Sequence, residues 1–384
     1  MQKIKVLLIF PLFFAFLKAK SAYRTNCYYG SWAEEGLGRK LTPEKFDPKL
    51  CTHFSYAFFD VDDKGKVKHY KNEKDRKLLS RVLKLRSRNK NLKLIAVIGG
   101  PDVDSSVFSN IAETPKYRKN FRVSAKTVLK DLRMHGLDLH WLEPGSADNF
   151  NDKANLVTLL SDLREEFNQT LSLGVSVRGQ VDYAQRWYDI PKISSLVDYI
   201  NVMAYNYTHS GVLHAPLFTA GEDSVDESIQ FWLSRGAPSE KLNLGVALIG
   251  RSYKVRVMQS NSMTTEGPYV AANGIREFTR IKKYHEMCTT IHNNTAEYHY
   301  DPVTVASFSI EDGTVLTGFE SDQSFAVKIG FVIEYDLGGL MIWTIDNDDF
   351  TGKCGEKFRL LKLIKYCLES NYGYIKCTTY LPVD

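Results

Sequence analysis

Short apolar runs typical of β-strands recur along the chain, and the fourth of them shows the two-residue alternation of a strand clearly. Between them lie stretches whose apolar residues follow the i, i+3, i+4 spacing of amphipathic helices, as in residues 75–89, 115–135 and 149–168. The strand-like runs number eight and cover residues 26–32, 52–59, 92–100, 136–142, 170–177, 198–205, 242–248 and 339–346. A strand followed by a helix, repeated eight times, predicts an α/β fold, the (β/α)8 TIM barrel.

The alternation breaks between the seventh and eighth runs, over residues 250–338. Only the last part, residues 321–339, has the pattern of a helix that ends at a glycine. The residues before it are rich in strand and turn formers. We therefore predict a small α+β insertion domain at residues 250–319, between strand 7 and helix 7. The barrel is then formed by residues 22–249 and 320–384.

The first residues have the pattern of a secretory signal peptide. Two lysines precede the apolar run 6–17, and small residues follow it. The run is too short to span a membrane comfortably, so we expect no membrane insertion. We predict a signal peptide at residues 1–21, with cleavage after Ser21 or, alternatively, after Ala19, and a secreted, extracellular protein.

The formal net charge of +5 arises mostly from this removable segment. The segment carries four lysines and no acidic residue, so its removal takes the charge from +5 to +1. So small a charge gives no reason to expect nucleic acid or an anionic membrane as a partner.

An even number of cysteines in a secreted chain predicts disulfides. Their spacing leaves the connectivity open, and no C-x-x-C pair indicates a zinc site. The six residues are Cys27, Cys51, Cys288, Cys354, Cys367 and Cys377.

Three N-x-[S/T] sequons mark candidate glycosylation sites, at Asn168, Asn206 and Asn293. Asn168 lies near the end of a predicted helix and is the preferred acceptor. Asn206 follows the sixth strand, and as a barrel-facing residue it is expected to be poorly accessible.

The fourth predicted strand carries an unusual row of side chains. Because residues i, i+2 and i+4 of a strand share a face, Asp138, His140 and Leu142 are expected to lie together. Leu142 is nearest the carboxyl end of the strand, where this fold places catalytic groups. Two polar residues followed by an apolar one suggest a functional face in which the last polar side chain has been replaced.

This strand resembles the signature D-G-x-D-x-D-x-E, followed by Y-P, of the chitinases and chitinase-like proteins of glycoside hydrolase family 18. In this chain the corresponding stretch reads "HGLDLHWLEP", residues 135–144. The segments "CYYGSW", "CTHFSYAF", "VIGG", "DYINVMAY", "GRSY" and "GGLMIWTIDNDDFTG" are similar to the family as well, in the same order and spacing. The resemblance covers essentially the whole mature chain.

The resemblance implies a chitinase fold without chitinase activity. In active members the last acid of the signature protonates the glycosidic oxygen, and the acetamido group of the substrate is the nucleophile. Leu142 takes the place of that acid, His140 and His135 take the places of two others, and Asp138 remains. The family's M-x-Y-D on the sixth strand ends here in Asn206, so a second strand has lost an acid. No catalytic residue is therefore assigned.

Two alternatives concern the same strand. A β-bulge could turn Glu143 toward the site, whereas a regular strand leaves it as an exposed carboxylate at the strand end. The pattern H-x-x-D-x-H invites a metal site, but His135 and His140 are five residues apart and are expected to face opposite ways. We expect an interior, hydrogen-bonded histidine, with no metal and no cofactor.

The resemblance also implies a sugar groove, because sugars stack on aromatic rings and polar groups orient them. Two family groups are missing: an aromatic residue at the rim is replaced by Pro101, and a tyrosine by Ile249. The loop after the sixth strand is short and lacks a tryptophan. The expected carbohydrate-binding residues are Trp343, Tyr205, Asn206, Arg251, Trp32, Tyr28 and Phe58, with barrel-core packing as the alternative for the last two.

By the same resemblance, the disulfides are Cys27–Cys51 and Cys288–Cys354, which leaves Cys367–Cys377.

Three functions follow as hypotheses for a monomeric protein. The first is a lectin for a chitin-type oligosaccharide or glycan, and the second is a signalling or growth-factor-like protein that binds a cell-surface protein through its surface. The third is a residual hydrolase that uses Glu143.

Overall fold

A computed structural model describes residues 22–35, 40–146, 149–207, 213–219, 223–254, 277–369 and 377. The predicted signal peptide at residues 1–21 lies outside the described residues. Within them, no helix is long and apolar enough to cross a membrane.

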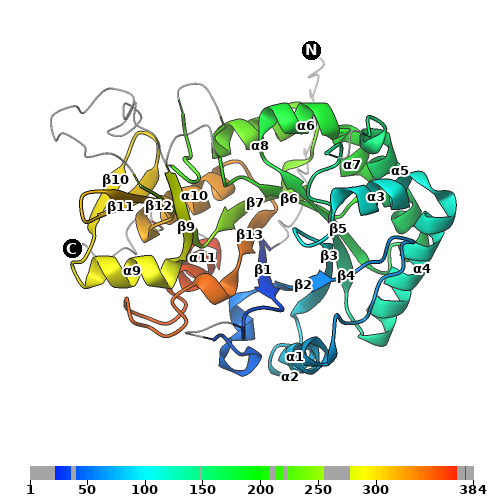
Figure 1. Cartoon of the computed structure of the whole chain (residues 1–384), viewed down its shortest axis with the longest axis horizontal. Coiled ribbons are helices and arrows are strands. Elements are labelled where there is room, and N and C mark those ends of the chain that lie inside the picture. The colour runs from blue at the N-terminus through cyan, green and yellow to red at the C-terminus, as the bar shows by residue number, and fades with distance from the viewer. Residues whose placement is uncertain are drawn as a thin grey trace, which may run out of the picture.

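Eight parallel strands close into a barrel, which confirms the predicted fold class. Helices surround the barrel in Figure 1. In order around the barrel, the strands are β1 (Arg24–Gly30), β13 (Gly339–Trp343), β7 (Leu242–Ala247), β6 (Tyr199–Met203), β5 (Ser172–Arg178), β4 (Gly136–His140), β3 (Lys93–Gly99) and β2 (His53–Phe59).

The helices pack an apolar stripe against the strands. In α4 (Pro115–Asp131) the buried residues Phe121, Ala125, Val128 and Leu129 follow helical spacing, and Pro115 begins the helix. The other helices outside the insertion are α1 (Glu73–Leu83), α2 (Leu85–Arg88), α3 (Ser105–Glu113), α5 (Asp152–Phe167), α6 (Val181–Trp187), α7 (Ile190–Leu196), α8 (Val225–Ser234), α10 (Asp322–Glu334) and α11 (Arg359–Glu369).

A five-stranded antiparallel sheet and the helix α9 (Tyr284–His292) lie beside the barrel, between β7 and α10. The sheet occupies one side of the molecule in Figure 1, with α9 below it. Its strand order is β10 (Glu297–Asp301), β11 (Ala306–Glu311), β12 (Val315–Phe319), β8 (Ile249–Lys254) and β9 (Glu277–Lys283). The expected α+β insertion is thus present as a separate sheet.

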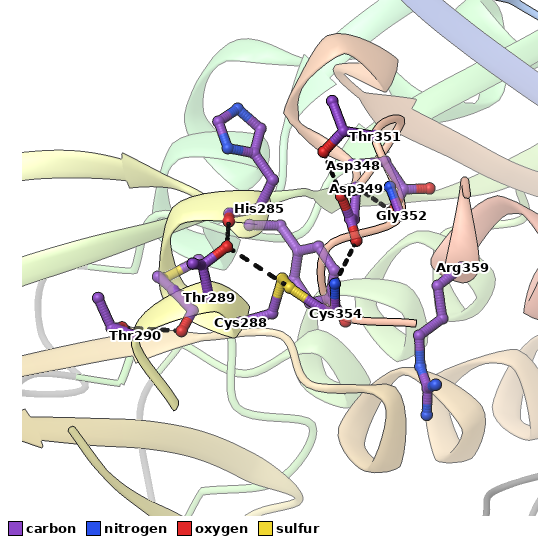
Figure 2. Close-up of a disulfide and its surroundings, with 12 residues drawn as sticks. His285, Cys288, Thr289, Thr290, Asp348, Asp349, Thr351, Gly352, Cys354 and Arg359 are labelled. Atoms are coloured by element: carbon purple, nitrogen blue, oxygen red, sulfur yellow. Dashed lines mark hydrogen bonds between the residues drawn. A yellow bond between two sulfur atoms is a disulfide. The ribbon is translucent and has the colours of Figure 1, made fainter. Parts of the chain in front are cut away.

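Three disulfides join the pairs Cys27–Cys51, Cys288–Cys354 and Cys367–Cys377. The first two are those that the family resemblance implies, and the third is the pair that it leaves. Figure 2 shows the second of them, which ties α9 of the insertion to the loop after β13. The carboxylate of Asp349 holds that loop, because it accepts hydrogen bonds from the Gly352 and Cys354 amides at 2.9 and 2.7 Å. The insertion is therefore fixed covalently to the end of the barrel that follows Trp343.

Candidate functional site

Aromatic rings gather at the carboxyl ends of β1, β2, β4 and β13. The ring of Trp343 lies 5.7 Å from Tyr28, 5.9 Å from Trp32 and from Phe58, and 6.1 Å from His140, centroid to centroid. These are distances at which aromatic pairs stabilise one another. The barrel mouth is therefore closed from below by one connected aromatic cluster.

Only some of these rings are open to solvent. Trp343 and Trp32 are half-buried. Tyr28 and Phe58 are 0% and 1% exposed, so they support the two tryptophans from beneath and present no face to a ligand. This corrects the expectation that all four aromatic residues line a sugar groove, and it favours the packing alternative for Tyr28 and Phe58.

Asp138 lies under this cluster, at the centre of a polar network inside the barrel. Its carboxyl group accepts hydrogen bonds from the Tyr28 hydroxyl, the Asn201 amide at 2.6 Å and the Ser176 hydroxyl at 3.1 Å. Burial raises the pKa of Asp138 to about 7, although these three hydrogen bonds oppose the rise. Asp138 is fully buried, so its hydrogen bonds serve the barrel interior.

The row Asp138, His140 and Leu142 faces the barrel axis, in agreement with the alternation. Leu142 packs with the cluster that contains Phe58 and Trp343, while Trp141 stacks on the other side against Phe108 of α3, 5.8 Å away. The register with β3 ends at the pair Gly99–His140, so β4 stops two residues earlier than predicted. An isobutyl group, which cannot donate a proton, therefore stands at the mouth.

The imidazole of His140 is nearly enclosed by rings and is 3% exposed. The Phe58 ring meets it edge to face at 5.3 Å. Burial lowers the pKa of His140 to about 4, so the imidazole is neutral at neutral pH. Its Nδ1 atom is buried without a hydrogen-bond partner.

His135 lies at the other end of the strand, where its Nδ1 accepts a hydrogen bond from the Leu94 amide at 3.0 Å. The two histidines therefore do not form a common metal site. Among the described residues, the one cluster with metal-like spacing is Cys288, Asp349 and Cys354. Its two sulfur atoms are bonded to each other in a disulfide, so they are not thiolate ligands.

Glu143 is a partly exposed acid just beyond the carboxyl end of β4. Its Oε1 atom lies 2.6 Å from Nη1 of Arg178, and its side chain is 43% exposed. The guanidinium of Arg178 in turn lies 4.8 Å from the centre of the Tyr183 ring. The described register of β4 with its two neighbouring strands contains no bulge, and the carboxylate of Glu143 forms an ion pair at the rim.

The residues after β6 meet the insertion sheet at this same end of the barrel. Tyr205 is half-buried and packs against the aromatic cluster, whereas Asn206 is exposed. The amide oxygen of Asn206 accepts a hydrogen bond from Arg251 on β8. Arg251 also donates to the Tyr253 hydroxyl at 2.9 Å. Arg251 thus links the insertion to the mouth.

The expectation that Asn206 is poorly accessible is wrong. Its backbone has a φ of 65°, which turns the chain out of the strand and brings the side chain to the surface. Asn168 and Asn293 are also exposed, at the carboxyl ends of α5 and α9. All three therefore meet the requirement of surface access, and their glycosylation stays a prediction.

Sequence reasoning missed a buried ion pair that holds the loop beyond Asn206. Lys328 on α10 donates hydrogen bonds to Glu320 and to the carbonyl of Ala215, and all three groups are buried. The hydroxyl of Ser324 donates to the second oxygen of Glu320 at 2.8 Å. The signal was a lysine on the apolar side of a predicted helix, within "FAVKIGFVI".

Comparisons with known proteins place this site in context. The sequence model of the glycosyl hydrolases family 18 matches residues 24–348. Putative chitinase 1 of Margaritifera margaritifera is 30% identical over 391 residues, which cover 96% of this chain and 81% of that protein. The crystal structure of the Ostrinia furnacalis Group IV chitinase has a TM-score of 0.80 at 33% identity and covers 90% of this chain and 99% of its own.

A second solved structure carries a different description. Human YKL-39, described as a pseudo-chitinase with retained chitooligosaccharide binding properties, has a TM-score of 0.79 at 26% identity. The match covers 91% of this chain and 100% of that one. Similar proteins therefore include both chitinases and a pseudo-chitinase.

Proposed function

This chain belongs to the glycosyl hydrolases family 18, and we propose that it is a secreted lectin that binds short N-acetylglucosamine-type oligosaccharides without hydrolysing them. One observation carries the proposal: the half-exposed ring of Trp343 stands at the barrel mouth, where Trp343 and Leu142 pack against the same buried cluster. The aromatic face suits a sugar ring, and the neighbouring aliphatic side chain offers no proton.

The surroundings of the mouth support the proposed absence of hydrolysis. A general acid must lie within hydrogen-bond reach of the leaving oxygen. By the family resemblance, Leu142 occupies that place. Asp138 is buried beneath the Tyr28 ring, and Glu143 is paired with Arg178 at the rim. Among the described residues at the mouth, these two acids therefore offer no substitute donor.

The binding half of the proposal rests on the platform and on one similar protein. Trp343 is supported from below by Phe58 and Tyr28, so its ring is held in a fixed orientation. A platform that is already ordered loses little entropy when a sugar stacks on it. Human YKL-39, with the same fold, is described as retaining chitooligosaccharide binding.

Isothermal titration calorimetry with the tetramer of N-acetylglucosamine tests the proposal. We expect the wild-type protein to bind, and Trp343→Ala to weaken the affinity at least tenfold, about 1.4 kcal/mol. Tyr366→Ala is the matched control, because it removes a partly exposed aromatic ring on α11, away from the mouth. No binding heat, or equal affinity for the wild type and Trp343→Ala, would refute the lectin.

A second candidate function is signalling through the protein surface, by binding to a cell-surface protein. The observation in its favour is that two of the seven expected sugar contacts are buried and that Asn206 and Arg251 are bonded to each other. A pull-down from target-cell membranes that recovers a saturable protein partner, uncompeted by the tetramer, would favour it over the lectin.

Secretion is also part of the proposal, and it rests on the segment of residues 1–21. Amino-terminal sequencing of protein collected from the culture medium is expected to begin at Ala22, or at Lys20 if cleavage follows Ala19. A mature chain that begins at Met1 would contradict it. Light scattering is expected to show a monomer.

A further inference from the structure

We propose that Asn206 is a modification site, and that an N-linked glycan on it covers the barrel mouth and limits the access of outside ligands. This inference rests on the proposed secretion and goes beyond the lectin function, because it concerns a change to the chain itself. The sequon Asn206-Tyr207-Thr208 begins three residues beyond the end of β6 at Met203.

Attachment replaces one hydrogen on the side-chain nitrogen of Asn206. In the secretory pathway, Nδ2 forms a bond to C1 of the first sugar of an oligosaccharide that is carried on a polyisoprenyl diphosphate. The bond from C1 to the diphosphate oxygen breaks, the polyisoprenyl diphosphate leaves with that electron pair, and Nδ2 releases one proton. The amide oxygen takes no part in this transfer, so it remains a hydrogen-bond acceptor in the product.

The folded structure accommodates a sugar on this nitrogen. Asn206 is exposed, and its φ of 65° turns the chain out of the strand. Its Oδ1 atom accepts a hydrogen bond from Arg251, whereas Nδ2 donates none to the residues that the structure describes. Attachment therefore leaves the contact with Arg251 intact and costs the described part of the chain no hydrogen bond.

The position of Asn206 brings the first sugar to the rim of the mouth. The preceding residue, Tyr205, packs against the same buried cluster as Trp343 and Leu142. The hydrogen bond from Arg251 on β8 ties the Asn206 amide to the insertion sheet. The glycan thus starts where the strand ends meet the insertion. Because an N-linked glycan is bulky and hydrated, it excludes other molecules from the space around its root.

A second sequon lies at the opposite end of the barrel and provides a matched control. Asn168 ends α5, four residues before the start of β5 at Ser172. It therefore lies at the amino ends of the parallel strands, whereas the mouth is at their carboxyl ends. A glycan on Asn168 is expected to leave the mouth open.

The tryptophans of the chain report on access to the mouth. There are five, and three of them are buried: Trp141, Trp187 and Trp232 are 2%, 8% and 0% exposed. The other two, Trp32 and Trp343, are half-buried and belong to the aromatic cluster at the mouth. Quenching of tryptophan fluorescence by acrylamide therefore measures how freely a small neutral molecule reaches the mouth.

The test compares the wild type, Thr208→Ala and Thr170→Ala, each secreted as the full chain from eukaryotic cells. Thr208→Ala removes the sequon of Asn206, and Thr170→Ala removes that of Asn168. Glycopeptide mass spectrometry is expected to find a glycan on Asn206 in the wild type and in Thr170→Ala. We expect acrylamide to quench Thr208→Ala more strongly than the other two proteins. If the glycan leaves the mouth open about a tenth of the time, Thr208→Ala also binds the N-acetylglucosamine tetramer about tenfold more tightly.

A second comparison shows that the glycan, and not the Thr208 side chain, causes the difference. The wild type and Thr208→Ala made in the bacterial periplasm form disulfides but receive no such glycan, so they are expected to be quenched equally. If Thr208→Ala is not secreted from eukaryotic cells, trimming of the native wild type with an endoglycosidase decides, because trimming must then increase its quenching.

The outcomes separate this inference from the functions proposed above. An unmodified Asn206 in the secreted wild type would overturn it, and so would equal quenching of the secreted wild type and Thr208→Ala. If the two are quenched differently but neither binds the tetramer, the lectin fails and this inference stands. If the chain stays in the cells with residues 1–21 attached, the proposed secretion fails and the inference fails with it.

Discussion

Asp138 makes the stability of this barrel depend on pH in a direction opposite to that of an ordinary salt-bridged acid. Burial raises its pKa from 3.8 to about 7 in the folded protein. Between pH 4 and pH 7 the folded state therefore holds a proton on Asp138 that the unfolded state has released. Stability falls with rising pH wherever the folded state binds more protons.

The size of the effect follows from the two pKa values. They differ by 3.2, and each tenfold change in proton affinity is worth about 1.4 kcal/mol. Asp138 alone thus removes up to about 4 kcal/mol of stability as the pH rises from 4 to above 7. The side chain is fully buried, so solvent screening does not reduce this figure.

The substitution Asp138→Asn isolates this contribution, because asparagine has nearly the shape of the protonated acid and does not titrate. Its amide oxygen can accept the hydrogen bonds that Tyr28 and Asn201 now donate to one carboxyl oxygen of Asp138, and its amide nitrogen can donate to the Ser176 hydroxyl. Other buried groups titrate in both proteins and cancel in the difference. They include Asp348, with its pKa raised to about 7 by burial, and His53, with its pKa lowered to about 4 by burial.

The assay is urea unfolding of both proteins, with disulfides intact, followed by tryptophan fluorescence at intervals from pH 4 to pH 8. We expect the free energy of unfolding of Asp138→Asn, relative to the wild type, to rise by about 4 kcal/mol across this range. A difference that stays constant with pH would show that Asp138 titrates normally. The claim that burial outweighs the three hydrogen bonds to Asp138 would then be incorrect.

Two further predictions concern parts of the fold outside the mouth. Lys328→Met leaves Glu320 buried without its cation and is expected to cost about 3–5 kcal/mol, whereas adding Glu320→Leu recovers much of the loss. Equal denaturation midpoints for Lys328→Met and the wild type would contradict this. Replacing Cys367 and Cys377 by serine removes the disulfide between two cysteines that are 10 residues apart, and we expect the free energy of unfolding to fall by about 3 kcal/mol. An unchanged melting temperature would contradict this.

The barrel could be predicted because its signals are local. Each strand is a short, mostly apolar run, and each helix carries its own apolar stripe, as α4 does with Phe121 and Val128. The five-stranded sheet could be expected only as an α+β segment. Its pairing joins β8 to β12, strands far apart in the chain, and no local pattern specifies that order.

The sequence predicts which residues lie at the barrel mouth better than it predicts which of their side chains are exposed to solvent. The row of Asp138, His140 and Leu142 follows from a period of two, and the structure keeps it. Which ring faces solvent depends on the packing of several strand ends, so sequence did not separate buried Phe58 from half-exposed Trp343. The exposure of Asn206 depends on a positive φ that the sequence did not reveal.

The most direct test of the central claim, binding without hydrolysis, is one NMR sample of wild-type protein with the tetramer of N-acetylglucosamine. Saturation-transfer difference signals report contact with the sugar, and reducing-end anomeric signals report cleavage in the same tube. We predict clear saturation transfer and no increase in reducing ends over a buffer blank, because Leu142 and Trp343 pack against the same buried cluster at the mouth. New reducing ends above the blank, or no saturation transfer, would contradict the proposal.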